Sequence, residues 1–560
     1  MFKTILLIAF SLFVSSTTAF AQLPELNIER PFRRCGTSIL LEKLQNEGDT
    51  KTRVIDATKE YVPHTGTINI PVILVNFQDV KFTVNNPTKA FDQFFNGTSQ
   101  EDLGNGNDFN HGSVAQYFSD MSSGTFKINF KIYGPVTLDQ KETYYGGTAD
   151  DGSDENTDQL ITDAIAKLQA SDEKITDASL FCNGLSSVDC VYILYAGIGQ
   201  NDRGPNTAVW AKTGQPSATL AGKKVRWYSV AGEKTKYYVD AKGKVAKSGS
   251  PLIAGIGTTC HEFSHALGLP DFYPTANSAK VDNQEMEYWD LMDGGEYAGG
   301  DGFCPTAYTA FEKEEMGWPV DIQELTENQT VTMSKSTLEG GTAYKIVNPN
   351  NSNEYFMLEN IYNKTGWNSG QYGNGLLIYH VKRPSKNMTI FTRYNNKANY
   401  PGMAVVPADG ACLSSYLAAN ESTYEPSLYG DLFPGTGNMS PDTLNVTELS
   451  DAKPQPNFCW YDSNLTQKLP TNKALQNIKY SNGVVTFNYI HDVAAGINDI
   501  RINKPVDNRI FTVDGVYMGT NLNALPHGVY VTIQFRPSCN QTKNPEVIPG
   551  IFCIGMAEVV

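Results

Sequence analysis

The sequence lacks any apolar run that could cross a membrane beyond its first 21 residues. A spanning helix needs about 20 consecutive apolar residues, and the rest of the 560-residue chain offers none. It also lacks a basic stripe, because 60 acidic residues outnumber 44 basic ones and the formal net charge is −16. These absences argue against a transmembrane segment and against nucleic acid as a partner.

Charged residues are scarce, at 19% of the chain, and there is no internal repeat or low-complexity tract. Aromatic residues are plentiful instead, with 29 Tyr and 27 Phe. With few charged residues, the surface must be rich in Asn, Ser, Thr and Gly, which is typical of extracellular proteins. A chain of this length exceeds what one core supports, so we expect several domains.

The N-terminus has the pattern of a secretory signal peptide. Lys3 precedes an apolar run over Ile5–Val14, and Ala19-Phe20-Ala21 fits the small-x-small cleavage rule. A membrane anchor is the alternative, but the apolar run is too short for one. We therefore expect residues 1–21 to be removed and the protein to be secreted, extracellular or at the cell surface.

Nine cysteines are expected to pair in an oxidising compartment, and an odd number leaves at least one over. Their order along the chain suggests the pairs Cys182–Cys190, Cys260–Cys304, Cys412–Cys459 and Cys539–Cys553. Cys35 would then be the cysteine without a partner.

Changes in pattern along the chain predict five parts. Residues 22–65 are polar and charged, as in a propeptide or latency segment. Residues 66–319 alternate strands and helices, which predicts an α/β (α+β) domain. Residues 320–490 carry short alternating segments separated by Gly, Asn and Pro, which predicts an all-β sandwich. Residues 491–560 predict a further C-terminal β module.

The segment from Cys260 to Asp271 carries the strongest chemical signal. His261 and His265 are four residues apart, so on a helix both imidazoles face the same side and can bind one Zn²⁺. Glu262 lies beside them, where it can take a proton from a metal-activated water. Gly268 can end the helix and let the chain return Asp271 as a third ligand, which leaves a fourth position for water.

The extended motif HExxHxxGxxD resembles that of the metzincins, in particular the M6 peptidases typified by immune inhibitor A. Similar residues extend over Ile68–Trp318. Ala208-Val209-Trp210 resembles the edge strand that lines the family's substrate cleft, and Trp289–Gly295 resembles its Met-turn, with Met292 beneath the metal. The resemblance implies a metzincin-like catalytic domain and a zinc endopeptidase that cleaves proteins or peptides.

Two roles stay open at the level of sequence. Most metzincins have His where this chain has Asp271, so Glu285 and Glu287 are alternative carboxylate ligands. The residue that stabilises the oxyanion is not assigned, and Tyr297 is only a loose candidate.

Cys35 lies in Arg33–Thr37, within the expected propeptide, and the pattern Arg-Cys-Gly resembles the cysteine-switch segments of metzincin propeptides. A thiolate is a strong zinc ligand, so Cys35 could occupy the open position and keep a zymogen latent. The alternative is an unpaired or disulfide-bonded cysteine in a flexible arm.

Two weaker patterns concern calcium and sorting. The loops Asn105–Asn110 and Asp150–Asp154 could supply oxygen ligands to structural Ca²⁺, although neither is an EF-hand. Ile510–Gly519 and Leu525–Val531 resemble bacterial secretion-sorting domains, although the chain runs on to Val560.

Together these patterns predict a secreted zinc-dependent endopeptidase that hydrolyses extracellular proteins, with Glu262 as general base. One alternative is a metallohydrolase of another amide substrate. The other is a surface adhesin or glycan- or protein-binding protein with a metalloprotease-like domain. Glu262 argues against this last alternative, because a purely structural metal site needs no base.

Overall fold

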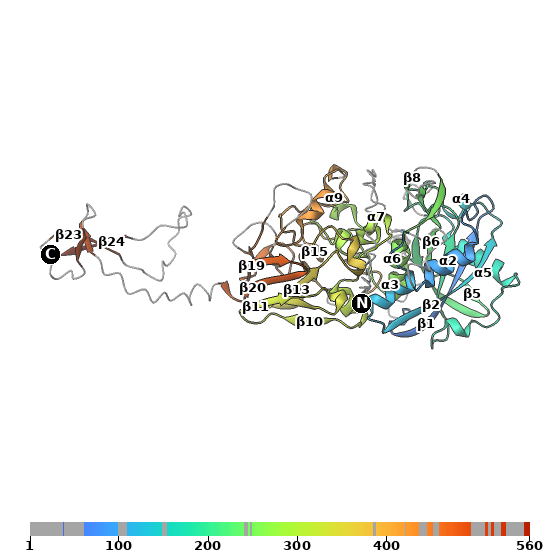
Figure 1. The fold of residues 1–560 in the computed structure, drawn as a ribbon, viewed down its shortest axis with the longest axis horizontal. Coiled ribbons are helices and arrows are strands. Elements are labelled where there is room, and N and C mark those ends of the chain that lie inside the picture. The colour runs from blue at the N-terminus through green and yellow to red at the C-terminus, as the bar shows by residue number, and fades with distance from the viewer. Residues whose placement is uncertain are drawn as a thin grey trace, which may run out of the picture. The chain divides into compact units, whose positions relative to one another are not determined.

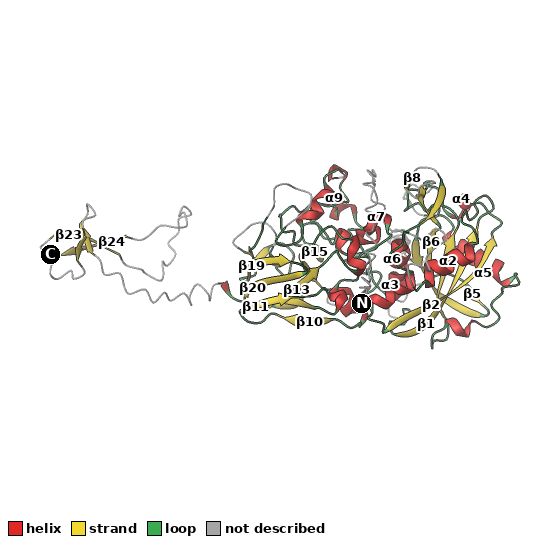
Figure 2. Cartoon of the chain, viewed as in Figure 1, coloured by secondary structure: helices red, strands yellow, loops and turns green. Residues whose placement is uncertain are grey.

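A computed structural model describes most of the chain between Tyr61 and Asp492 (Figures 1 and 2). The predicted signal peptide and Cys35 lie outside the described residues. The described residues are 37, 61–98, 109–147, 154–239, 245–246, 249–384, 388–420, 422–435, 445–451, 458–493, 510–512, 517–519, 528–533 and 554–559. Contacts divide the chain into two compact units, Met1–His491 and Asp492–Val560.

The first half of the larger unit is built on a six-stranded sheet with the order β2-β1-β3-β6-β4, and β5 also pairs with β6. Its inner strands are near-continuous apolar runs, as expected where both faces of a parallel sheet are covered. Strands β1, β2, β3 and β6 are parallel, whereas β4 pairs antiparallel with β6 at one edge. The strands are β1 (Gly66–Asn76), β2 (Phe126–Thr137), β3 (Val188–Tyr195), β4 (Lys212–Gly214), β5 (Thr219–Leu220) and β6 (Lys223–Gly232).

Alternate side chains of this sheet enter two separate cores. In β1, Val72 and Leu74 pack with helices α2, α3 and α6 on one face, while Ile73 and Val75 pack with α5 on the other. This is the period-two alternation of a strand covered on both sides. The helices are α2 (Pro87–Asn96), α3 (Val114–Met121), α4 (Glu142–Tyr145), η2 (Ala178–Phe181), α5 (Thr157–Gln169) and α6 (Ile256–Leu267).

Short elements connect this sheet to the second half of the unit. A small antiparallel sheet precedes α6, and a series of 3-10 turns and short helices follows it. They are β7 (Lys234–Val239), β8 (Val245–Ala246), β9 (Ser250–Ile253), η3 (Asn277–Ala279), η4 (Glu287–Trp289), η5 (Gly294–Tyr297), α7 (Ala298–Asp301) and α8 (Ala310–Met316).

Residues 321–490 form two larger sheets, β10-β12-β13-β14-β15 and β11-β20-β19-β16, and a two-stranded sheet, β17-β18. Side chains of both larger sheets, such as Leu358 and Phe487, share one core. The strands are β10 (Asp321–Glu324), β11 (Gln329–Met333), β12 (Thr342–Asn348), β13 (Asn351–Ile361), β14 (Gly375–Lys382), β15 (Met403–Val405), β16 (Leu449–Ser450), β17 (Cys459–Tyr461), β18 (Lys468–Pro470), β19 (Ala474–Ser481) and β20 (Val484–Ile490).

The largest hydrophobic core crosses from the first half of this unit into the second. It joins Phe263 and Met292 near the zinc motif to Tyr379 and Met403 in the later strands. Short helices lie between those strands: η6 (Thr337–Glu339), η7 (Gly366–Gly370), η8 (Ala418–Asn420), α9 (Tyr424–Ser427) and η9 (Leu428–Gly430). The two halves therefore stabilise each other through shared apolar burial.

The smaller unit contains a four-stranded antiparallel sheet with the order β22-β21-β23-β24. Its strands are β21 (Ile510–Thr512), β22 (Tyr517–Gly519), β23 (Gly528–Ile533) and β24 (Ile554–Val559). Among the described residues of the whole chain, no helix is long and apolar enough to span a membrane.

The predicted disulfides between described cysteines are wrong. Cys182, Cys190, Cys260, Cys304, Cys412 and Cys459 form no disulfide with one another. Cys182 belongs to the core on one face of the central sheet and Cys190 to the core on the other, so the sheet separates them. The Cys304 thiol instead lies 3.5 Å from the Trp367 carbonyl oxygen. Cys182 directly follows the short helix η2 and Cys190 lies in β3, so closeness in sequence did not place the two in the same core. Cys539 and Cys553 lie outside the described residues.

Candidate active site

The contacts and conformations at the two ends of α6 explain where the helix begins and where it ends. The Asn110 side chain accepts a hydrogen bond from the Ile256 amide at 3.0 Å, which satisfies one of the helix's first N–H groups. Gly268 ends the helix with φ 109°, a left-handed conformation that glycine adopts without strain. Every residue of the helix is buried, so both its apolar side and its polar side pack against other parts of the protein.

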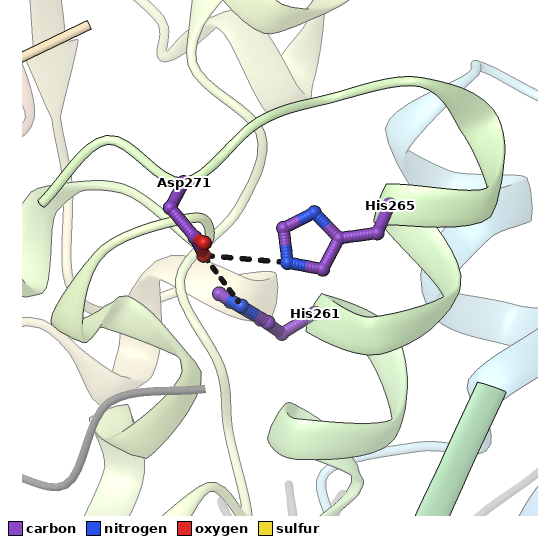
Figure 3. A group of neighbouring side chains, drawn as sticks. All are labelled: His261, His265 and Asp271. Atoms are coloured by element: carbon purple, nitrogen blue, oxygen red, sulfur yellow. Dashed lines mark ion pairs between the residues drawn. The ribbon is translucent and has the colours of Figure 1, made fainter. Parts of the chain in front are cut away.

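The chain after α6 returns to the helix and brings three side chains together (Figure 3). The Asp271 Oδ1 atom lies 3.3 Å from Nε2 of His261 and 3.3 Å from Nε2 of His265. One ligand atom from each residue lies within 4.8 Å of the other two, and all three residues are buried. Among the described residues this is the one His, Cys, Asp or Glu group with such a geometry.

Backbone carbonyls orient both imidazoles. Nδ1 of His261 lies 2.9 Å from the Leu291 carbonyl oxygen, and Nδ1 of His265 lies 2.7 Å from that of Leu269. A carbonyl can only accept, so each Nδ1 carries a proton, which leaves each Nε2 as the nitrogen that a metal could bind. Such outer hydrogen bonds are typical of histidines that bind a metal.

The electrostatics of the cluster favour a cation. Burial alone would lower the pKa of His261, but the carboxylates of Glu296 and Asp271 outweigh it and raise that pKa to about 10. Burial acts to raise the pKa of Asp271, yet the two imidazoles hold it well below its usual range. No described lysine or arginine is among the groups that shift these two pKa values.

These residues fit a divalent metal. Two nitrogen ligands and one carboxylate oxygen form a donor set that Zn²⁺ accepts, with a fourth position left for water. Nε2 of His261 makes no hydrogen bond within the described part of the chain. A buried polar atom of this kind requires an explanation, and a bound metal would supply it.

Glu262 is completely buried beside the two histidines, and its carboxylate oxygens differ. Oε2 accepts hydrogen bonds from the hydroxyls of Thr213, at 3.0 Å, and Thr37, at 3.1 Å. Oε1 has no hydrogen-bond partner among the described residues. One oxygen is therefore held in place and the other is available to accept a proton.

The segment around Met292 supports the cluster through its backbone. Met292 is completely buried. Its carbonyl accepts a hydrogen bond from the Phe272 amide at 2.9 Å, directly after Asp271, and the preceding carbonyl, of Leu291, orients His261. The amide of Met292 in turn donates to Asp290 at 2.7 Å. The segment thus fixes both the first histidine and the returning strand with the aspartate.

The alternative carboxylate ligands are not part of the cluster. The Glu287 carboxylate accepts hydrogen bonds from the amide and hydroxyl of Ser415. Burial raises the pKa of Glu285, and repulsion from the nearby Asp293 adds to the effect, so that the pKa is about 8. Tyr297, the loose candidate for oxyanion stabilisation, packs against an apolar group of Tyr288, Ala298, Tyr424 and Leu428.

Several neighbours of the site were not recognised in the sequence. Thr213 and Ser229 contact Glu262 from the sheet, and Glu296 lies close enough to change the pKa of His261. The pKa of Glu296 is raised to about 7, mainly by burial and also by repulsion from Glu262. The neighbouring His261 acts in the opposite direction and lowers this pKa. Isolated Thr, Ser and Glu residues carry no spacing signal. Only the sequence position of Glu296, shortly after the Met-turn, could have suggested it.

Thr37 is the described residue nearest to Cys35 in the chain, and it is completely buried at Glu262. Besides its bond to Glu262, its hydroxyl accepts a hydrogen bond from the Thr213 amide at 2.7 Å. A residue of the predicted latency segment therefore contacts both the edge strand β4 and the predicted general base.

The described parts of the predicted calcium loops have other partners. Asp154 forms a buried ion pair with Lys212 at 2.6 Å and accepts the Trp210 amide at 3.0 Å. Asn110 caps α6. The remaining residues of Asn105–Asn110 and Asp150–Asp154 lie outside the described residues apart from Phe109, so calcium stays a prediction.

Comparison with known proteins agrees with this geometry. The model of the family described as immune inhibitor A peptidase M6, catalytic domain, matches residues 58–318. These residues, somewhat less than half of the chain, match the catalytic domain of the M6 peptidases. The match begins at residue 58, before the predicted boundary at residue 66. The structure gives the reason: Val62 is 1% exposed in the main core, and its amide donates to the Ala266 carbonyl of α6 at 3.0 Å.

Two kinds of curated relatives resemble the M6 domain at low identity. The pre-pro-metalloprotease PrtV of Vibrio cholerae serotype O1 is 24% identical over 282 residues, which is 44% of this chain and 29% of PrtV. Immune inhibitor A of Bacillus thuringiensis subsp. alesti is 26% identical over 220 residues, which is 36% of this chain and 31% of that protein. The matched region spans less than a third of either relative.

Proposed function

We propose that this protein is a secreted zinc-dependent endopeptidase that hydrolyses peptide bonds of extracellular proteins. The observation that carries the proposal is the convergence of His261, His265 and Asp271 beside Glu262 within an M6 domain. In this proposal the three residues bind zinc, and Met292 lies in the Met-turn of a metzincin-like fold. The two sheets of residues 321–490 pack as a β-sandwich.

The chain's own residues supply the proton transfers of this reaction. Zinc at the three ligands would polarise the scissile carbonyl and lower the pKa of water. Glu262 would accept the proton of the attacking water at Oε1, the oxygen without a hydrogen bond, and deliver it to the leaving amine. Oε2 stays held by Thr213, so the base keeps its direction during the transfer.

We further propose that residues 22–57 keep the enzyme latent, with Cys35 directed at the metal. Cys35 stands two residues before Thr37 in the chain, and Thr37 contacts Glu262. Maturation must then cut between Thr37 and Tyr61, because Val62 and His64 belong to the peptidase. Nε2 of His64 lies 2.7 Å from the Leu267 carbonyl oxygen.

Secretion is part of the same proposal. The N-terminal pattern of residues 1–21 supports it, as does the name of PrtV, a pre-pro-metalloprotease. A sorting role for residues 491–560 stays a prediction.

The test is casein hydrolysis by the matured protein, with zinc quantified, with and without a phenanthroline chelator. We expect Glu262→Ala to keep one zinc and the fold but to lose at least about a hundredfold in kcat, because general-base catalysis contributes roughly 10²–10⁴. Glu327→Ala is the matched control, since Glu327 is exposed in the β-rich half. Retained turnover in Glu262→Ala contradicts the mechanism. Bound zinc without turnover in the parent protein favours a binding protein with a metalloprotease-like domain.

A further inference from the structure

Glu262 is held by two hydroxyl side chains of the central sheet. Thr213 Oγ1 lies 2.6 Å from the Glu262 carbonyl oxygen and 3.0 Å from its carboxylate Oε2. Ser229 Oγ lies 3.2 Å from the same carbonyl and 2.9 Å from Thr213 Oγ1. All three residues are completely buried, so these groups have no solvent to bind instead.

The sheet register fixes the two hydroxyls opposite each other. Thr213 in β4 pairs directly with Ser229 in the antiparallel strand β6. Residues opposite each other in such a pair point to the same face, which here is the face covered by α6. Threonine is also branched at Cβ and restricted at χ1, so its hydroxyl has little freedom to turn away.

Thr213 and Ser229 each have one hydroxyl proton, so each can donate to one acceptor at a time. Thr213 has one hydroxyl proton and three acceptors within reach, the carbonyl and the carboxylate of Glu262 and the hydroxyl of Ser229. Ser229 can donate its own proton to the carbonyl. With the carbonyl served by Ser229, the proton of Thr213 is available to the carboxylate, where a charge-assisted bond is stronger.

We propose that Thr213 is a positioning residue for the general base and that Ser229 acts through it. This inference rests on the proposed peptidase function. Thr213 holds Oε2 of Glu262 so that the other oxygen, Oε1, stays directed for proton transfer. Because the edge strand β4 supplies Thr213, the strand that borders the site also orients its base.

The experiment is a set of variants of the full chain, assayed for peptide hydrolysis after maturation. Thr213→Val keeps the branched shape without the hydroxyl. We expect its kcat to fall about tenfold to a hundredfold with KM and zinc content unchanged, since a hydrogen bond to a charged group is lost. Thr213→Ser keeps the hydroxyl and should restore kcat to within about threefold of the parent. Thr332→Val, at an exposed strand position, is the control.

Ser229 provides a second test. Ser229→Ala should lower kcat less than Thr213→Val, and the double variant should equal Thr213→Val alone, because Ser229 acts only through Thr213. Thermal unfolding of the metal-free proteins gives a readout without turnover. There, the effects of Thr213→Val and Glu262→Ala should be non-additive, because each removes the hydrogen bond between Thr213 and the Glu262 carboxylate.

The variants at Thr213 and at Glu262 distinguish a failure of this inference from a failure of the proposed function. If Thr213→Val keeps kcat within about twofold of the parent while Glu262→Ala is inactive, the peptidase proposal stands and Thr213 has no positioning role. Additive effects in unfolding also overturn the inference. If Thr213→Val fails to fold, Ser229→Ala and Thr213→Ser still decide it through kcat. If Glu262→Ala keeps full turnover, the proposed function fails first and this inference with it.

Discussion

Thr37 and Glu262 are 225 positions apart in the chain, yet their side chains are in contact at 3.1 Å. At the scale of single residues, this contact bears most directly on regulation. The contact uses the same carboxylate oxygen that Thr213 holds. A prosegment that binds both the base and the edge strand would block substrate as well as restrain the base.

Removing Cys35, the predicted latency residue, or Thr37, which contacts Glu262, should therefore release activity. We expect Cys35→Ala to convert itself to the mature form earlier than the parent, because the metal's open position loses its thiolate. Thr37→Val should shorten the latent period less, since one hydrogen bond is worth about 1–3 kcal/mol when its acceptor is charged. Conversion of the full chain is followed with time on gels, with Cys459→Ala as the control. An unchanged latent period in Cys35→Ala counts against the switch.

At the scale of elements, helix α6 is the part that the rest of the site is built around. Gly257, in its first turn, lies so close to η5 that a Cβ atom there would be 1.8 Å from the Glu296 carbonyl oxygen. The amide of Gly257 also donates to the Gly302 carbonyl at 3.0 Å. The absence of a side chain thus lets the helix pack against the turn that carries Glu296.

This close approach reverses the usual effect of alanine in a helix. Alanine normally stabilises a helix by about 1 kcal/mol relative to glycine. We expect Gly257→Ala instead to lower the free energy of unfolding by about 3 kcal/mol or more, because backbone must move. Denaturant unfolding and zinc content measure this. Gly66→Ala, at φ +80° in open space, should cost only about 1–2 kcal/mol. Equal losses in both variants would show that no close approach exists at Gly257.

At the scale of the whole molecule, an excess of buried acid should make stability depend on pH. Burial, and then repulsion from Asp293, raises the pKa of Glu285 to about 8, and burial raises the pKa of Asp293 to about 6. Neither oxygen of Glu285 accepts a hydrogen bond of good geometry among the described residues, although Asn283 and Ser414 partly oppose the rise. The folded state therefore binds protons more tightly than the unfolded state, where these groups titrate near pH 4.

Raised carboxyl pKa values make the folded protein less stable as the pH rises. The free energy of unfolding should fall as pH rises from about 4 to about 8, because the unfolded state binds fewer protons over that range. Glu285→Gln removes one of these charges at nearly constant shape. It should raise the free energy of unfolding by about 3–4 kcal/mol more at pH 8 than at pH 5, because about 1.4 kcal/mol is linked to each pH unit between the two pKa values. Glu327→Gln, at an exposed position, should change neither value. Equal effects of Glu285→Gln at pH 5 and pH 8 would disprove the raised pKa.

The sequence by itself predicted the helix of His261 and His265 and the return of Asp271 to them. Those two inferences depend on local rules, because helical spacing places two imidazoles on one face and glycine ends the helix. The M6 domain was recognised instead by the resemblance of motifs over Ile68–Trp318. The division of the chain into mixed and β-rich parts also follows from local periodicity.

Only the tertiary structure decided which distant residues meet that helix. The contacts of Thr37, Thr213 and Ser229 with Glu262 join segments far apart in sequence, and none carries a periodic signal. Packing also separates Cys182 from Cys190, which belong to different cores. It also places Val62, from the predicted propeptide, in the main core. Burial against distant segments is a property of the packed chain, and local pattern does not encode it.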